Sequence, residues 1–458
     1  MLRRSLLIVL LVIVFSGCFP ASRNAARNDQ GVEQVTVISA QQAAALPAAD
    51  TSASTQGESA ASVPVKEPAE VSAASVDDAQ VDAEPAPTTA VKSATQSAQS
   101  QPALPAAVGP DQFPENVNPL TGLPVENIEA LSLSPALVSV TNFPVTARPQ
   151  AGLSYSPFVF EMYIGEGMTR FLALFYGDYP RVDERGAAVP TGESIGPVRS
   201  GRLPYESLRQ LYNGFLVMAS ASPNVKASLG SFANIWGNDT GDINSAMIPV
   251  SKLETIAQNS GKSVDEGMLS GLRFEQNAPA EGKLGNMLWI PYNFLNQIIW
   301  RYDAASGAYL RYQDAADGKT FVQATDRLNG DPLTYENVVV LFATHHARAE
   351  TLIDIDLMYI DRMPALLFRD GKMYEVFWTT ANEDYEKRTG HVRPVRFVDA
   401  QGNPFPLKPG QTWVEIVQPF TKYNETVDSD VYMDLRRKTD PGSGNWAVHF
   451  YPTVPEEQ

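Results

Sequence analysis

Two short blocks of the chain hold polar residues whose types and spacing could do chemistry. The first, FEMYIGEGMTRFLALF (160–175), is otherwise apolar, and the second, IGPVRSGR (195–202), is rich in glycine and arginine. The candidate residues in these blocks are Glu161, Glu166, Arg170, Arg199, Ser200 and Arg202. An unpaired charge is costly to bury, so charged side chains inside apolar strands need a partner or a ligand.

Two interpretations of the arginines remain open, and the first is the one we favour. Arg199 or Arg170 forms a structural ion pair with Glu161 that ties neighbouring strands together. Alternatively, Arg199, Ser200, Arg202 and Arg170 clamp an anionic ligand, because a guanidinium group binds carboxylate or phosphate through two parallel hydrogen bonds. The sequence does not decide between these interpretations.

A third interpretation makes Glu161 and Glu166 the acid/base pair of a hydrolase that acts on cell-wall sugar or peptide. Such a pair needs two carboxyl groups that face one open cleft. Structural ion-pair networks also contain perturbed carboxylates, so the interpretation as a non-enzymatic protein is preferred. No other catalytic residue is identified.

A metal centre is not expected from the histidine and aspartate residues around position 350. His345 and His346 are adjacent, and adjacent side chains of a strand point to opposite faces. Asp354 and Asp356 alternate with isoleucines, which is typical of the wet face of a half-buried strand. We expect neither a metal nor a cofactor.

The sole cysteine, Cys18, ends a segment typical of a lipoprotein export signal. Two arginines are followed by an unbroken apolar run from Leu6 to Phe15 and then by Ser16-Gly17-Cys18. This run is too short to span a bilayer as a helix, so residues 1–17 are predicted to be a cleaved signal peptide. Acylation of Cys18 would then anchor the protein to the outer face of the cell membrane.

Residues 18–112 are predicted to form a disordered tether. From Ala21 to Gln112 the chain contains no Phe, Trp or Tyr and consists mainly of Ala, Ser, Thr, Gln, Pro and Val. Such a composition cannot bury enough apolar surface to offset the entropy lost on ordering. The folded part would therefore stand away from the membrane.

The net charge of -17 limits the class of partner. Nucleic-acid binding needs basic patches that neutralise phosphates, so a nucleic-acid partner is not expected. The expected partners are the membrane, reached through lipid at Cys18, and an envelope protein or a cell-wall ligand.

The folded part is predicted to have an α+β architecture with two domains, 113–285 and 286–458. In the first, apolar runs at 136–142, 158–164, 170–177 and 215–219 predict strands, interleaved with helices that begin near residues 204, 222 and 251. This order predicts a mixed sheet with packed helices. In the second, paired runs around Gly307 and around Asp370-Gly371 predict hairpins and a mainly antiparallel β domain.

The same blocks resemble the YerB-like family of bacterial lipoproteins. The N-terminal likeness is carried by NPLTGLP (118–124), ARPQAGLS (147–154) and the two blocks at 160–175 and 195–202. The C-terminal likeness is carried by YENVVVLF (335–342) and FPLKPGQTWVEIV (405–417). The resemblance implies a lipid-anchored, two-domain α+β envelope protein with a binding or scaffolding role and no assigned molecular function.

This chain departs from the family pattern after Ala219. Ser220-Ala221 stands where family members usually have a His-Gly turn, and MIPVSKL (247–253) replaces a polar Pro-His-Asn block. If those polar blocks line a site in relatives, the site is altered here.

Overall fold

A computed structural model describes residues 107–179, 194–265 and 267–455. The predicted signal peptide, Cys18 and the tether up to residue 106 lie outside the described residues. Residues 107–112 belong to the fold, because strand β1 (Ala107–Val108) pairs antiparallel with β9 (Arg273–Glu275). The tether boundary predicted at residue 112 is therefore too late, since composition cannot detect a two-residue edge strand without aromatic residues.

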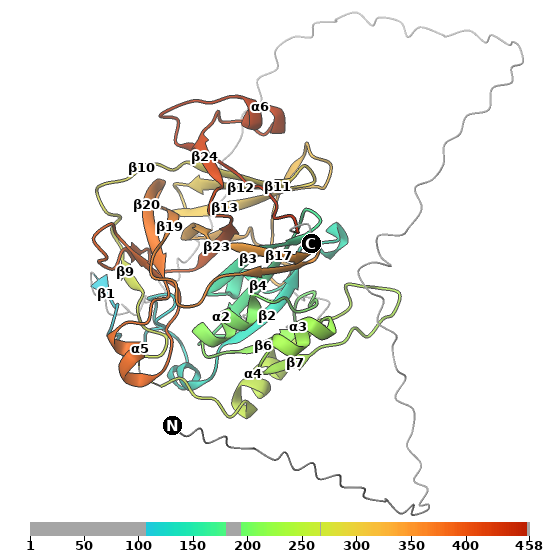
Figure 1. The fold of residues 1–458 in the computed structure, drawn as a ribbon, viewed down its shortest axis with the longest axis vertical. Helices are drawn as coiled ribbons and strands as arrows, with labels where there is room; N and C mark the ends of the chain where they lie inside the picture. Colours follow the sequence, from blue (N-terminus) through green and yellow to red (C-terminus); the bar gives the residue numbers. More distant parts are fainter. Residues whose placement is uncertain (1–106, 180–193, 266, 456–458) are drawn as a thin grey trace, which may run out of the picture. The chain divides into compact units, whose positions relative to one another are not determined.

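An 11-stranded mixed sheet runs through both predicted domains (Figure 1). Its order is β10-β20-β19-β16-β23-β3-β4-β2-β6-β7, with β21 beside β20. Strand β23 pairs parallel with β16 on one side and with β3 on the other, so backbone hydrogen bonds join the two halves. The bounds are β2 Ala136–Thr141, β3 Phe158–Gly165, β4 Met168–Phe175, β6 Phe215–Met218, β7 Phe232–Asn234, β10 Lys283–Leu284, β16 Asn337–Phe342, β19 Met363–Arg369, β20 Lys372–Thr379, β21 Arg396–Val398 and β23 Thr412–Val417.

A 7-stranded sheet packs against one face of this large sheet. Its order is β14-β13-β12-β11-β25-β24, with β15 beside β13. The ring of Trp300 on β12 lies 5.4 Å from that of Trp413 on β23, which places the two sheets in contact. The bounds are β11 Met287–Asn293, β12 Asn296–Asp303, β13 Ala308–Asp314, β14 Phe321–Gln323, β15 Thr334–Tyr335, β24 Lys422–Glu425 and β25 Asn445–His449.

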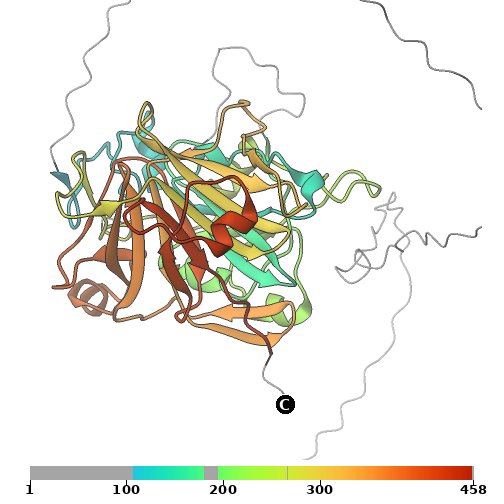
Figure 2. The ribbon, with the colours of Figure 1, turned by 90° about the horizontal axis from the view of Figure 1, so that it is seen from above.

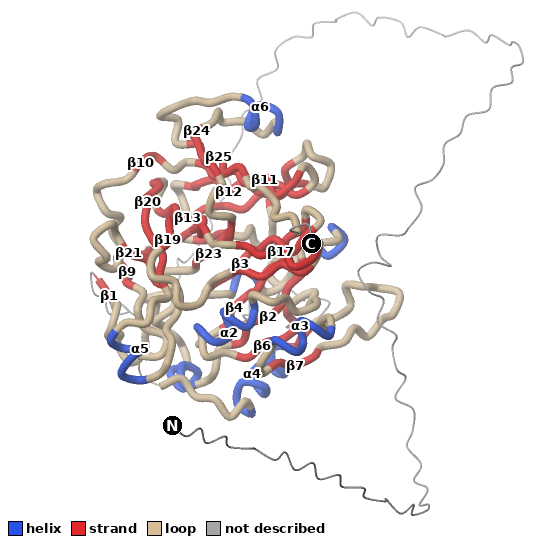
Figure 3. Tube along the Cα trace, viewed as in Figure 1, coloured by secondary structure: helices blue, strands red, loops and turns tan. Residues whose placement is uncertain are grey.

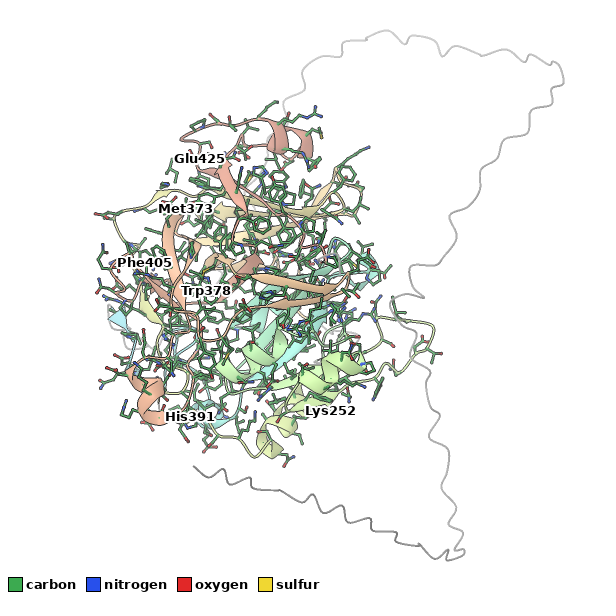
Figure 4. All side chains as sticks on the ribbon, viewed as in Figure 1. Lys252, Met373, Trp378, His391, Phe405 and Glu425 are labelled. Atoms are coloured by element: carbon green, nitrogen blue, oxygen red, sulfur yellow. The ribbon has the colours of Figure 1, made fainter. Side chains whose placement is uncertain are left out.

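Helices cover the opposite face of the large sheet near β2 and β6 (Figures 1 and 2). Tyr212, at the end of α2, lies 5.7 Å from Phe160 of β3. Amphipathic spacing explains α4, where Leu253 and Ala257 are buried while Lys252 points outward (Figure 4). The helices are α2 Tyr205–Leu211, α3 Pro223–Ser228, α4 Val250–Asn259, α5 Asp384–Thr389 and α6 Tyr432–Arg437, with 3-10 turns η1 Ile128–Ser132, η2 Val145–Ala147 and η3 Leu153–Tyr155.

The fold is strand-rich (Figure 3), and its sheets are mixed and antiparallel. The predicted hairpins β12–β13 and β19–β20 are confirmed. The expectation of mainly antiparallel pairing in the second half misses the parallel pairs made by β23 and by β25 with β11. Helix α4 begins at Val250, after Pro249, close to the start predicted near residue 251. The remaining short strands are β5 Ser194–Ile195, β8 Ile248–Pro249, β17 His345–Ala349, β18 Leu352–Ile355 and β22 Pro406–Leu407.

In the part of the chain that the structure describes, none of the helices is both long and apolar enough to cross a bilayer.

Candidate anion-binding site

The segment 196–202 inserts between the carboxyl ends of two parallel strands. Strands β2 and β6 pair directly only from Ala136 to Val138 of β2. Beyond that point the backbone N–H of Arg199 donates to the carbonyl of Ser139 at 2.8 Å, and its carbonyl accepts from Ala219 at 2.9 Å. Ligands of open α/β sheets bind outside the carboxyl ends of strands, so this is a place where a site is expected.

Arg170 reaches this segment from the neighbouring strand β4. It stands opposite Thr141, the last residue of β2, and its Nη1 donates to the carbonyl of Ser200 at 3.3 Å. Arg202 donates from Nη1 to the carbonyl of Gly201 at 3.1 Å. The structure therefore fixes the guanidinium groups of Arg170 and Arg202 on two consecutive carbonyls of one segment.

Arg199 completes the cluster from the same segment. Its Nη2 donates to Oδ1 of Asn244 at 2.9 Å, and the charge of Asp242 acts on it from the same loop. The arginine cluster, as we call Arg170, Arg199 and Arg202, is the one constellation predicted from the sequence that the structure brings together.

Burial is the main influence on the pKa values of the arginine cluster. Burial lowers the pKa of Arg170 to about 9, and repulsion from Arg202 and Arg199 adds to that effect. Burial also lowers the pKa of Arg202 and of Arg199, although Asp242 opposes the shift of Arg199. The cluster is thus a partly buried concentration of positive charge.

Arg170 differs from the other buried arginines of the described residues. Four of these arginines form ion pairs with carboxylates: Arg311 with Glu161 and Glu415, Arg369 with Asp370, and Arg393 and Arg396 with Glu386. Arg170 is only 7% exposed, yet its one hydrogen bond within the described part goes to a neutral carbonyl. The Nε atoms of Arg170 and Arg202 are also buried and have no hydrogen-bond partner among the described residues. A buried arginine in this state is the arrangement expected where an anion binds.

Glu161 does not pair with Arg170 or Arg199, so the favoured ion-pair prediction is wrong. Its Oε2 accepts from Nη2 of Arg311 at 2.8 Å, and its Oε1 accepts from Thr169 at 2.6 Å. The register of the β3–β4 hairpin is the reason. Glu161 stands opposite Phe171, whereas Arg170 stands opposite Met162, so the two charges lie on opposite faces of the sheet.

Arg311 joins both sheets through a second carboxylate that sequence reasoning missed. Its Nη1 donates to Oε1 of Glu415 at 3.3 Å, while its guanidinium stacks over the ring of Trp413 at 4.4 Å. Trp300 and Tyr292 donate to Glu415 at 2.9 and 3.0 Å. The signal that singled out Glu161, a charge inside an apolar strand, is also present in TWVEIV and AYLRYQD and would have found both residues.

Glu161 and Glu166 do not face a common cleft. Glu161 has no exposed surface and is held by Arg311, whereas Glu166 lies exposed on the β3–β4 turn with a φ of 52°. The geometry that a pair of glycosidase carboxyls requires is therefore not present between these two residues.

A cavity of about 1090 Å³ lies elsewhere, beside α5, and its lining includes Tyr385 and Arg393. Arg393 already pairs with Glu386 at 2.7 Å and with Glu383 at 3.1 Å, so the charge on this wall is compensated. Across the described residues no group of three His, Cys, Asp or Glu side chains could hold a metal ion. His346 instead contacts Asp356 at 2.9 Å on the exposed surface.

Comparisons with known proteins place this chain in a family. DUF3048 is a family of proteins of unknown function. Its N-terminal domain matches residues 120–253, and its C-terminal domain matches residues 289–414. The chain is 29% identical over 325 residues to the "Putative lipoprotein YerB" of Bacillus subtilis (strain 168), which covers 67% of this chain and 88% of that protein. The crystal structure of YerB from Bacillus subtilis aligns with a TM-score of 0.50 at 25% identity, over 66% of this chain and 96% of that one.

The chain belongs to the YerB-like family of DUF3048 proteins. The arginine cluster lies within the matched N-terminal domain, and Arg311 lies within the matched C-terminal domain. The molecular function of the family is unassigned, so the function must be argued from the site.

Proposed function

We propose that this protein is a lipid-anchored envelope protein whose folded part binds an anionic ligand at the arginine cluster. The observation that supports the proposal is the state of Arg170, a buried arginine without a carboxylate in the described structure, while the other four buried arginines have one. Evolution rarely leaves an uncompensated buried charge unless it serves a ligand or a reaction.

The lipid anchor is supported by the Ser16-Gly17-Cys18 boundary behind the apolar run and by the description of YerB as a lipoprotein. An acyl chain at Cys18 would hold the protein at the outer face of the cell membrane, with the ligand site carried beyond the tether. The net charge of -17 makes attraction to anionic lipid unfavourable, so anchoring would depend on the acyl chains.

Arg170→Met is expected to abolish anion-dependent stabilisation while leaving the ligand-free protein at least as stable as wild type. The substitution removes an uncompensated buried charge, and the carbonyl of Ser200 keeps the hydroxyl of Ser139 at 3.3 Å. Wild type should gain about 2.7 kcal/mol when phosphate reaches about 100 times its dissociation constant. Thermal unfolding of the purified full-length protein at low millimolar phosphate measures both effects.

Arg437→Met is the matched control, because it removes the same charge from an exposed position on α6. The Arg437→Met protein should be stabilised by phosphate as much as wild type is. Comparison with Arg170→Met then separates binding from the general stabilisation that phosphate gives at high concentration. If Arg170→Met still responds to phosphate, or if its ligand-free form loses several kcal/mol, the arginine is structural and the proposal fails.

Cys18→Ala is expected to remove fatty-acid labelling completely and to leave the protein uncleaved or released from membranes. The thiol of Cys18 is the only one in the chain, so no other residue can take a thioether-linked lipid. Metabolic labelling with a radioactive fatty acid, followed by fractionation of the cells, tests this prediction. Label on the Cys18→Ala protein would contradict the lipid anchor without affecting the proposed ligand site.

A further inference from the structure

We infer that the ligand of the arginine cluster is a small soluble molecule that carries a phosphate monoester. This inference rests on the proposed function and specifies the chemistry of the ligand. Three features of the cluster support it: its net charge, the way its guanidinium groups are held, and its depth below the surface.

The net charge of the cluster matches a dianion. The charges of Arg202 and Arg199 act on Arg170, and Asp242 is the carboxylate that acts on Arg199 within the described part of the chain. Tyr205 also faces Arg170 and Arg202, but burial raises the pKa of its hydroxyl, so it stays neutral. Two positive charges are left without a counter-charge. A phosphate monoester carries nearly two negative charges at neutral pH, whereas a carboxylate or a phosphate diester carries one.

The guanidinium groups are positioned to donate hydrogen bonds to a compact ligand that carries several oxygen atoms. Arg170 and Arg202 each use Nη1 on a backbone carbonyl, those of Ser200 and Gly201. Their Nη2 groups donate to no acceptor in the described regions. Each guanidinium group is therefore held by a hydrogen bond through Nη1 and still has N–H groups that can bind a ligand. A terminal phosphate offers three oxygens to separate guanidinium groups, while a carboxylate offers two. Fixing the donors in advance lowers the entropy cost of binding.

The depth of the cluster favours a soluble ligand over a membrane surface. Arg170 is 7% exposed and Arg202 is partly buried, so a ligand must reach below the surface of the protein to contact them. The net charge of -17 opposes close approach to an anionic membrane, which disfavours a lipid headgroup as the ligand.

Four small anions separate the possible chemistries: glycerol 3-phosphate, dimethyl phosphate, acetate and malonate. Binding to the purified full-length protein is measured by calorimetry at pH 8 and constant ionic strength. Glycerol 3-phosphate should bind at least about tenfold more tightly than the monoanions and malonate, because it adds charge and a third oxygen. Arg202→Met should remove this preference, and Arg437→Met should keep it.

Each outcome supports or overturns a stated claim. If acetate, dimethyl phosphate or malonate binds as tightly as glycerol 3-phosphate, the inference of a phosphate monoester is wrong, while the proposal of anion binding stands. If none of the four binds, the proposed function fails as well. Should Arg202→Met not fold, Arg199→Met provides the same test, because Arg199 is only partly buried and makes one side-chain hydrogen bond within the described residues.

Discussion

Arg311→Met is expected to lower the free energy of unfolding by about 3–5 kcal/mol at pH 8, because it leaves two carboxylates buried without their cation. Arg311 is 1% exposed, and its guanidinium contacts Glu161 at 2.8 Å and Glu415 at 3.3 Å. Neither carboxylate has any exposed surface. The loss should shrink at pH 5, where both carboxylates can take up a proton. Urea unfolding at the two pH values measures the effect.

Arg301→Met is a matched control for this prediction. Arg301 also contacts two carboxylates, Asp428 and Asp430, each at 2.6 Å, but both partners are mostly exposed. Exposed ion pairs contribute roughly 0–1 kcal/mol, so the control should lose little stability. Equal losses in Arg311→Met and Arg301→Met would show that burial of the network does not set its energy. Changing Glu161 and Glu415 to Gln as well should restore part of the stability of Arg311→Met.

The arrangement of this network suggests why the chain keeps a costly buried charge on the face of the sheet opposite to Arg170. Glu161 lies on β3, Glu415 on β23 and Arg311 on β13, so the three side chains connect both sheets and both predicted domains. Apolar packing alone would tolerate sliding of one sheet over the other, whereas paired buried charges are satisfied in only one register. The network and the arginine cluster therefore contrast: one fixes the fold, and the other is left uncompensated.

Local signals in the sequence were sufficient to predict many strands but not their neighbours. The turn at Asp370-Gly371 and the alternation on either side predict the β19–β20 hairpin from residues close in sequence. The position of β23 between β16 and β3 depends on pairing across long stretches of chain, for which periodicity carries no information. The same limit hid the pair Glu161–Arg311, whose members lie 150 residues apart.

The error over Arg170 comes from a register shift beside the β3–β4 turn. Gly165 and Gly167 mark a tight turn between the two strands, and both have positive φ in the structure. The turn pairs Gly165 with Met168, and a β-bulge or similar irregularity between Tyr163 and Gly165 then shifts the register by one residue, so Met162 stands opposite Arg170 and Glu161 lies on the other face. The residue types of the block at 195–202 did not predict its position between β2 and β6, because its backbone hydrogen bonds to these strands leave no periodic pattern in the sequence.

Glu415→Gln is expected to abolish a loss of stability that wild type shows as the pH rises from 5 to 8. Burial, together with repulsion from Glu161, raises the pKa of Glu415 to about 8, although Arg311 opposes the shift. The unfolded chain releases this proton near its ordinary pKa of 4.5. The folded state therefore holds one more proton between these pH values, and stability falls by at most about 1.4 kcal/mol per pH unit. This contribution is complete below pH 4.5 and is lost as the pH passes through 8.

Glutamine reproduces the protonated carboxyl at this position. Its Oε1 can accept from Trp300 and Arg311, as Oε1 of Glu415 does at 2.9 and 3.3 Å, while its Nε2 can donate to the hydroxyl of Tyr292. Glu415→Gln should thus match wild type at pH 5 and exceed its stability at pH 8, as measured by urea unfolding across this range. Glu375→Gln is the control, because Lys283 holds the pKa of that exposed carboxyl below its ordinary value and it stays ionised throughout. An unchanged slope in Glu415→Gln would show that the extra proton resides elsewhere, with Glu161 the first residue to test, because burial raises its pKa as well.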